Sequence, residues 1–365
     1  MKEKISVVVP IYNVENYLEK CLDCLLNQTL KDIRIICVND GATDNSPEIL
    51  KKYAEKDSRI EVVEKKNGGL SSARNAGLEK VKTEFVMFCD SDDYFSPKMC
   101  EKLLASIEKE KTDIAACGTE IVYLAHDEMR ESDRKYYRLE FHGKNYIDDE
   151  IMLKTDVSVW NKVFRTKTIK ENNIEFPEGL NNEDFYFFNA YMSVSSTISF
   201  VNQKLYNYVR RENSIMSANF QKDTLSLDHL LVAEKLFDFY RKTGFLKVHT
   251  DLFWQQWVDS FWFSLEHSSK NHHKEIRLHA KEFALKHLKN YPPESDSVSY
   301  DVKYIIANSP LSYIRRKGRQ VLASAYKKIN ISYRQQSFIN SNIEDLQRKI
   351  DDLSDRLDTL KEKND

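Results

Sequence analysis

Between residues 5 and 117 the chain alternates short apolar, β-branched runs with helical stretches, and the links between them are short. Such runs are typical of strands buried in a sheet. Strands that alternate with helices form a mainly parallel sheet with helices on both faces. The sequence therefore predicts an α/β fold followed by a helical C-terminal region. The predicted strands begin at Ile5, Ile33, Ile60, Phe85 and Ile114.

Polar residues follow four of these strands. They are Tyr12 and Asn13, Asp40, Asn67 and the segment 90–93. In parallel sheets ligands bind beyond the carboxyl ends of the strands, so four polar loops at that edge favour a nucleotide and metal site. Neither a G-x-G-x-x-G after the first strand nor a P-loop is present, which argues against a dinucleotide-binding fold and a P-loop enzyme. We also expect Asn13 to cap the helix that follows it.

Three carboxylates fall within four positions, at Asp90, Asp92 and Asp93. Acids so close together repel and are costly to desolvate unless a cation lies among them. Mg²⁺ and Mn²⁺ bind through one or two carboxylates and complete their shell with water and phosphate. The stretch therefore predicts a divalent metal that holds a diphosphate. The alternative is a polar loop and helix cap, in which Asp and Ser are ordinary residues.

Four stretches together resemble the family-2 glycosyltransferases of the GT-A fold, in particular those of bacterial capsule and cell-surface polysaccharides. They are VVVPIYN (7–13), VNDGATD (38–44), NGGLSSARNAG (67–77) and CDSDD (89–93). The resemblance covers about residues 5–215 and implies sugar transfer from a nucleotide diphosphate donor, usually UDP-linked, with inversion at the anomeric carbon. One departure is Ala42, where the family more often has Ser.

The resemblance also implies roles for individual residues. Tyr12, Asp40 and Asn67 would hold the nucleotide base, Asp90 would contact the ribose, and Arg74 would lie near the diphosphate. The full predicted donor site is Pro10, Tyr12, Asn13, Asp40, Asn67, Gly68, Arg74, Asp90 and Ser91. The predicted metal ligands are Asp90, Asp92 and Asp93.

Glu183 and Asp184 precede the aromatic run 185–187. Sugar transfer needs a base that takes the proton from the attacking hydroxyl, and an apolar wall raises the pKa of a carboxylate toward a useful value. The pair also resembles the family's Glu-Asp motif, in which the Asp is the base. We therefore predict Asp184 as the base and Glu183 as its neighbour, which orients it or binds the acceptor. The alternative is a helix start with acids in its first turn.

Acceptor contacts are predicted at two places. Trp160 offers a flat face to a sugar ring and Lys162 would lie near phosphate, in a stretch similar to one in capsule and cell-wall members of the family. Trp160 as an ordinary core residue is the alternative. Arg210 or Arg211 would stabilise the leaving diphosphate or fix the acceptor.

The C-terminal part changes to helical periodicity. A basic segment with an apolar face, residues 303–334, suits either an anionic membrane surface or packing on the protein itself. A heptad seam over 339–360 favours a parallel dimer, and pairing with a partner helix or the membrane is the alternative. The predicted division is 1–215 (catalytic domain), 216–300 (helical domain), 301–335 (basic amphipathic segment) and 336–365 (coiled-coil tail).

The net charge of −2 gives no general attraction to nucleic acid. No apolar run is long enough to span a membrane, and the six cysteines are expected to be reduced, so we predict a cytoplasmic protein with peripheral contact to the inner face of the cell membrane. The leading interpretation is a metal-dependent glycosyltransferase with a UDP-sugar donor and a glycan acceptor. A sugar nucleotidyltransferase and a non-catalytic glycosyltransferase-like scaffold are the alternatives.

Overall fold

The structure, a computed structural model, describes residues 3–123, 141–210 and 226–307. Most of the predicted basic segment 303–334 and all of the predicted coiled-coil seam 339–360 lie outside the described residues. Membrane contact and dimer formation through these segments therefore stay predictions.

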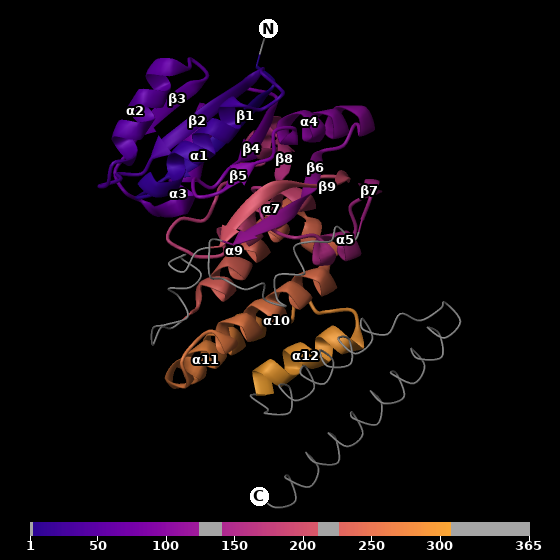
Figure 1. Cartoon of the computed structure of the whole chain (residues 1–365). Helices are drawn as coiled ribbons and strands as arrows, with labels where there is room; N and C mark the ends of the chain where they lie inside the picture. Colours follow the sequence, from indigo (N-terminus) through magenta and orange to yellow (C-terminus); the bar gives the residue numbers. More distant parts are fainter. Residues whose placement is uncertain (1–2, 124–140, 211–225, 308–365) are drawn as a thin grey trace, which may run out of the picture. The chain divides into compact units, whose positions relative to one another are not determined.

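The N-terminal half alternates strands and helices as predicted. Its elements are β1 (Ile5–Ile11), α1 (Glu15–Leu26), β2 (Ile33–Asn39), α2 (Ser46–Lys56), β3 (Ile60–Glu64), α3 (Gly69–Lys80) and β4 (Phe85–Phe88). Strand β1 pairs in parallel with β2 and β4, and β2 pairs in parallel with β3. All residues of β1 are buried, because helices cover both faces of this part of the sheet. The expected α/β fold is confirmed, and the carboxyl ends of these strands meet at one edge (Figure 1).

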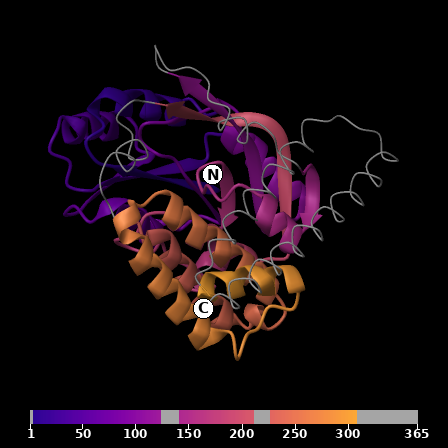
Figure 2. The ribbon, with the colours of Figure 1, turned by 90° about the horizontal axis from the view of Figure 1, so that it is seen from below.

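The rest of the sheet is more mixed than the sequence suggested. Its elements are β5 (Tyr94–Phe95), α4 (Met99–Glu110), β6 (Ile114–Tyr123), β7 (Gly143–Tyr146), α5 (Asp149–Lys154), β8 (Lys162–Arg165), α6 (Thr166–Glu171), α7 (Glu183–Ser193) and β9 (Thr197–Arg210). The strand order is β3-β2-β1-β4-β8-β6-β9-β5, with β7 beside β9. Strand β8, which the sequence did not reveal, lies antiparallel between β4 and β6. The long, bent β9 pairs with β7 along its first half and with β5 along its second (Figure 2).

Helices that follow the sheet belong to the same compact unit, Met1–Ile276. They are α9 (Asp228–Thr243), η2 (Phe245–Lys247), α10 (Thr250–Glu266) and η3 (Lys270–His272). Helix α9 packs against α7 and α10. These helices thus cover the α7 side of the sheet, and the predicted domain boundary after residue 215 stays a prediction.

The second unit, Arg277–Asp365, is described only to residue 307. It contains most of α11 (His273–His287) and all of α12 (Asp296–Ala307). In neither unit does the described part of the chain contain a helix long and apolar enough to cross a membrane.

Helix α3 lies unusually close to the sheet at Gly77. A Cβ atom on Gly77 would be 2.4 Å from Cγ1 of Val8 and 3.2 Å from Cγ2 of Val38. Only a residue without a side chain permits this approach. This close contact sets the distance between α3 and the sheet, and so the position of Arg74, which lies one turn earlier on α3.

We expect Gly77→Ala to destabilise the protein by about 1–3 kcal/mol, because the added methyl group overpacks the contact with Val8. Thermal unfolding followed by circular dichroism measures the change. The matched control is Glu79→Ala, which changes an exposed residue of the same helix and should leave the unfolding temperature near that of the wild type. Equal unfolding temperatures for the two variants would show that α3 does not depend on this approach.

Candidate active site

The loops that follow β1 and β2 are tied together. Asn13 has a left-handed backbone (φ 51°), and its Oδ1 accepts a hydrogen bond from the backbone N–H of Thr43 at 2.8 Å. Its predicted role as the cap of α1 is wrong, because its side chain is used to close one loop onto the other. The first turn of α1 is capped instead by Asp44, whose Oδ2 accepts from the N–H of Glu15 at 2.9 Å.

Asp40 organises the turn before α3. This side chain is almost fully buried, and it accepts hydrogen bonds from the N–H groups of Gly68 at 3.0 Å and Gly69 at 2.8 Å. Lys65 pairs with the same carboxylate. A negative charge at a helix N-terminus is favourable, so Asp40 stabilises the start of α3. Its predicted contact with the nucleotide base stays a prediction.

The other predicted donor residues lie along the same edge. Tyr12 is 48% exposed and offers an open aromatic face. Asn67 and Gly68 are exposed too, whereas Pro10 and Ser91 are buried. The structure thus leaves Tyr12 and Asn67 accessible to a ligand, and their roles in base binding stay predictions.

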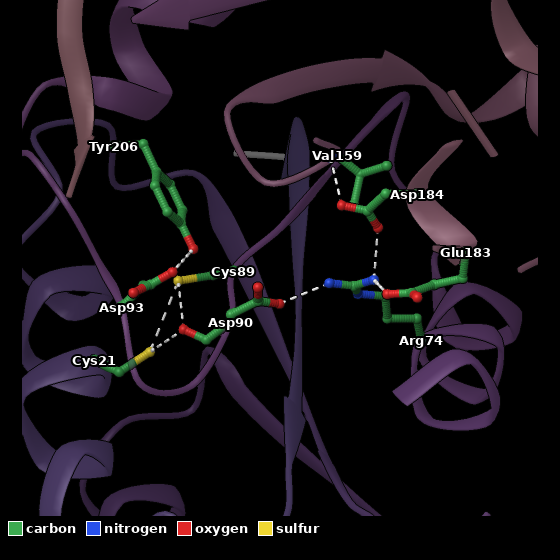
Figure 3. Close-up of polar contacts among 9 residues, drawn as sticks. All are labelled: Cys21, Arg74, Cys89, Asp90, Asp93, Val159, Glu183, Asp184 and Tyr206. Carbon is green, nitrogen blue, oxygen red and sulfur yellow. Dashed lines mark hydrogen bonds and ion pairs between the residues drawn. The ribbon is translucent and has the colours of Figure 1, made fainter. Parts of the chain in front are cut away.

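Arg74 is the centre of the site (Figure 3). Its side chain is 1% exposed, and its guanidinium contacts three carboxylates from two other elements. Nη1 donates to Glu183 and to Asp184, both at 2.7 Å, and Nη2 donates to Asp90 at 2.8 Å. Burial alone would lower the pKa of Arg74, but the three carboxylates raise it, so the guanidinium stays charged. The guanidinium joins the acid after β4 to the acids of α7, and its predicted place near the diphosphate stays a prediction.

Asp184 has the properties expected of a general base. Burial raises the pKa of its carboxyl to about 7; the charge of Arg74 opposes this rise and that of Glu183 adds to it. Its Oδ2 accepts from the N–H of Val159 at 3.1 Å, so both oxygens are oriented. A general base must be ionised, and above this pKa most of the Asp184 carboxyl is carboxylate. Its pKa therefore suits proton transfer near neutral pH.

Asp93 is not placed as a metal ligand. It is 2% exposed; its Oδ1 accepts from the N–H of Val209 at 2.7 Å, and its Oδ2 is paired with the hydroxyl of Tyr206 at 2.6 Å. Burial raises the pKa of Asp93 well above its ordinary value. Its role is to fasten the loop after β4 onto β9, because the backbone of that loop turns Asp93 into the core.

The predicted acceptor residues are largely buried. Trp160 is 7% exposed and stacks on Tyr206, with ring centroids 4.2 Å apart. Lys162 is fully buried in the central strand β8, so it cannot contact a bound phosphate as predicted. Arg210 lies over the ring of Tyr208, and Arg211 is outside the described residues. Of this group, only the two arginines stay proposals as acceptor contacts.

Asn75 is a site residue for which sequence reasoning found no role. Its Oδ1 accepts from the N–H of Phe176 at 2.8 Å, and its Nδ2 donates to the carbonyl of Phe176 at 2.9 Å. The ring of Phe176 stacks on that of Phe187 in α7, with centroids 4.1 Å apart. Asn75 thus ties α3 to the segment that leads into α7. It belongs to the motif at 67–77, but nothing in the sequence identifies its distant partner.

Asp90 and Asp92, the two other predicted metal ligands, could supply only part of a metal's coordination shell. Among the residues that the structure describes, no group of three or more Asp, Glu, His or Cys side chains is arranged to hold a metal ion. Asp90 and the half-buried Asp92 remain at the edge of the sheet, and Asp90 uses one oxygen for Arg74. One or two carboxylates are what Mg²⁺ or Mn²⁺ takes from a protein when phosphate and water supply the other ligands.

The fold is shared with a solved structure. TarS of S. aureus (residues 1–349, in complex with UDP-GlcNAc) superposes with a TM-score of 0.53 and 22% sequence identity, covering 86% of this chain and 92% of that one. Identity this low shows a common fold and no more. It agrees with the mixed, mostly parallel sheet and the helices around it.

The chain belongs to glycosyl transferase family 2, whose family model matches residues 6–170. It is 33% identical over 234 residues to glycosyltransferase GlyG of Streptococcus pneumoniae, covering 60% of this chain and 75% of GlyG. It is 35% identical over 222 residues to glycosyltransferase GlyA of the same organism, covering 58% of this chain and 31% of GlyA. The match to this chain therefore spans less than a third of the length of GlyA.

We expect Asp93→Ala to destabilise the protein while Asp92→Ala does so much less. Removing the Asp93 carboxylate leaves the buried N–H of Val209 and hydroxyl of Tyr206 unpaired, at a cost of about 1–3 kcal/mol each. Thermal unfolding of both variants measures the difference. An unfolding temperature for Asp93→Ala as high as that for Asp92→Ala would contradict the structural role of Asp93.

Proposed function

We propose that the protein is an inverting, metal-dependent glycosyltransferase that moves a sugar from a UDP-sugar to a hydroxyl of a carbohydrate acceptor. The observation that carries this is the Asp184 carboxyl, whose pKa of about 7 suits a base and which one buried guanidinium joins to Asp90 at the strand edge. One guanidinium thus holds the proposed base close to the proposed donor-binding acid. Asp184 can then act on the attacking hydroxyl while Asp90 contacts the donor. Family membership supports the reaction class.

In the proposed reaction Asp184 removes the proton of the acceptor hydroxyl as its oxygen attacks the anomeric carbon. The new carbon–oxygen bond forms on the face opposite the donor phosphate, the bond to that phosphate oxygen breaks, and UDP leaves with the bonding electrons. Arg74 holds Asp184 in place and supplies positive charge beside Asp90. The Asn75 contact with Phe176 keeps the segment before α7 in position.

A divalent cation at Asp90 and Asp92 would supply charge that stabilises the departing diphosphate. These two carboxylates would hold it together with donor phosphates and water. Asp93 has no part in this set, because both of its oxygens are used inside the protein.

The donor and acceptor classes come from relatives. TarS, which shares the fold, was solved with UDP-GlcNAc, which supports a UDP-sugar as the donor. Over 223 residues the chain is 29% identical to a poly(ribitol-phosphate) beta-glucosyltransferase of Bacillus spizizenii. This supports a cell-surface polymer as the acceptor. In keeping with such an acceptor, we propose that the enzyme works at the inner face of the cell membrane and as a homodimer, through residues 303–334 and 339–360.

Two alternatives make different predictions. A sugar nucleotidyltransferase would release pyrophosphate rather than UDP. A non-catalytic scaffold would neither bind nucleotide nor turn it over. The pair of acids to which Arg74 donates, Glu183 and Asp184, favours the enzyme.

We expect selective binding of UDP over GDP, CDP and dTDP in the presence of Mn²⁺, measured by calorimetry. Binding should weaken strongly in EDTA and in Asp92→Ala, because a cation held by Asp90 and Asp92 would supply positive charge to the diphosphate. Glu171→Ala, an exposed acid on α6, is the matched control and should bind UDP like the wild type. Binding of none of the four nucleotides would remove the enzyme hypothesis in favour of the scaffold.

We expect Asp184→Asn to lower the rate of transfer by about 10²–10⁴, the usual contribution of a general base. The affinity for UDP should change little, because the substitution removes a proton acceptor and keeps the side-chain shape. Release of UDP from UDP-glucose, UDP-galactose and UDP-N-acetylglucosamine measures the rate. A variant as active as the wild type would show that Asp184 is not the base.

A further inference from the structure

Lys162 is a buried cation that the proposed reaction does not use. It lies on β8 between β4 and β6, and its side chain is fully buried. Its ammonium donates to the carbonyl oxygen of Ser158 at 2.6 Å and to Oδ1 of Asn161 at 2.7 Å, and it faces the ring of Phe188 at 4.9 Å. These partners are all neutral. A buried ammonium is costly even when it is hydrogen-bonded, so its place in the centre of the sheet calls for a function.

The two hydrogen bonds of Lys162 close both ends of the segment 158–161. Asn161 is itself fixed to β6, since its Nδ2 donates to the carbonyl of Cys117 at 3.0 Å and its carbonyl accepts from the N–H of Cys117 at 3.0 Å. In the middle of the segment, the N–H of Val159 donates to Oδ2 of Asp184 at 3.1 Å. Lys162 therefore holds the backbone that holds the proposed base.

We propose that Lys162 is a positioning residue for the base: it fixes the segment 158–161 so that the Val159 N–H orients the Asp184 carboxylate on the side opposite Arg74. The inference rests on the proposed function for its kinetic consequence, but its structural content stands on the hydrogen bonds alone. Arg74 donates a hydrogen bond to Oδ1 of Asp184, and the Val159 N–H donates one to Oδ2, so each oxygen has a separate donor. The carboxylate cannot rotate without losing one of them.

The charges around the two groups determine the sign of the pH effect. Burial lowers the pKa of Lys162, and the negative charges of Asp156 and Asp184 oppose this. Asp184 faces Arg74, Glu183 and Asp90 as well as the Val159 N–H. Loss of the Lys162 cation and loosening of the Val159 hydrogen bond both favour protonated Asp184. The pH at which activity appears should then rise, because the base must be ionised.

The test is Lys162→Met, which keeps the length of the side chain and removes its charge. The matched control is Lys167→Met, because Lys167 is 81% exposed on α6. The readouts are UDP release from the three UDP-sugars above as a function of pH, and hydrogen exchange of the backbone amides of residues 158–161.

We expect kcat to fall about tenfold or more in Lys162→Met, with the donor KM within about twofold of the wild type. The acidic limb of the pH–rate profile should move upward by about half a unit or more. Amide exchange in 158–161 should become about tenfold faster or more, since the segment loses both anchors. Lys167→Met should match the wild type in all three measurements. An unchanged acidic limb together with unchanged exchange would overturn the proposal.

If Lys162→Met does not fold, the variant Asp156→Asn provides the test of the proposal. Asp156 is half-buried, and its Oδ1 accepts from the N–H and the hydroxyl of Ser158, a role that Asn can keep. Without the negative charge of Asp156, the positive charge of Lys162 stabilises ionised Asp184 more strongly. The pKa of Asp184 should then fall, and the acidic limb of the pH–rate profile should move to lower pH. A limb that does not move would overturn the proposal. If the wild type releases UDP from no UDP-sugar, the proposed function fails, and amide exchange in Lys162→Met still decides whether Lys162 holds the segment.

Discussion

One buried guanidinium holds the site together. Arg74 contacts carboxylates from the end of β4 and from the start of α7, elements that are about 90 residues apart in the chain. Like charges so close together would repel, and the arginine makes their proximity favourable. A buried cation that lost its acids would be left unpaired, which is among the most destabilising changes a core can suffer. The geometry of the site is thus also a condition for the stability of the fold.

The position of Arg74 depends in turn on how α3 meets the sheet. Gly77 lets the helix approach Val8 more closely than any side chain would allow, and Asp40 stabilises its first turn. Asn75 then binds the backbone of Phe176, and so fixes the segment before α7 to the same helix. Within the motif at 67–77, Arg74, Asn75 and Gly77 therefore fix the geometry of the site, whereas Asn67 and Gly68 stay accessible to a ligand.

Local patterns predicted the parts of the structure that depend on neighbouring residues. The strands of the N-terminal half, the polar loops at their ends and the acids of α7 all follow from periodicity and chain order. The directions of single side chains did not follow. Asp93 turns inward because the loop backbone and the distant Tyr206 favour it. Lys162 was predicted as a ligand contact because a charged residue gives no local sign of a central strand only four residues long.

The region matched by the family model ends at residue 170, before the acids of α7 and before the helices that cover that side of the sheet. The site is therefore not confined to the region that the family model matches. An exchange of modules between two such enzymes at that border would combine an arginine from one parent with carboxylates from the other. An exchange that includes all of α7, within the compact unit Met1–Ile276, would keep Arg74 with its own carboxylates.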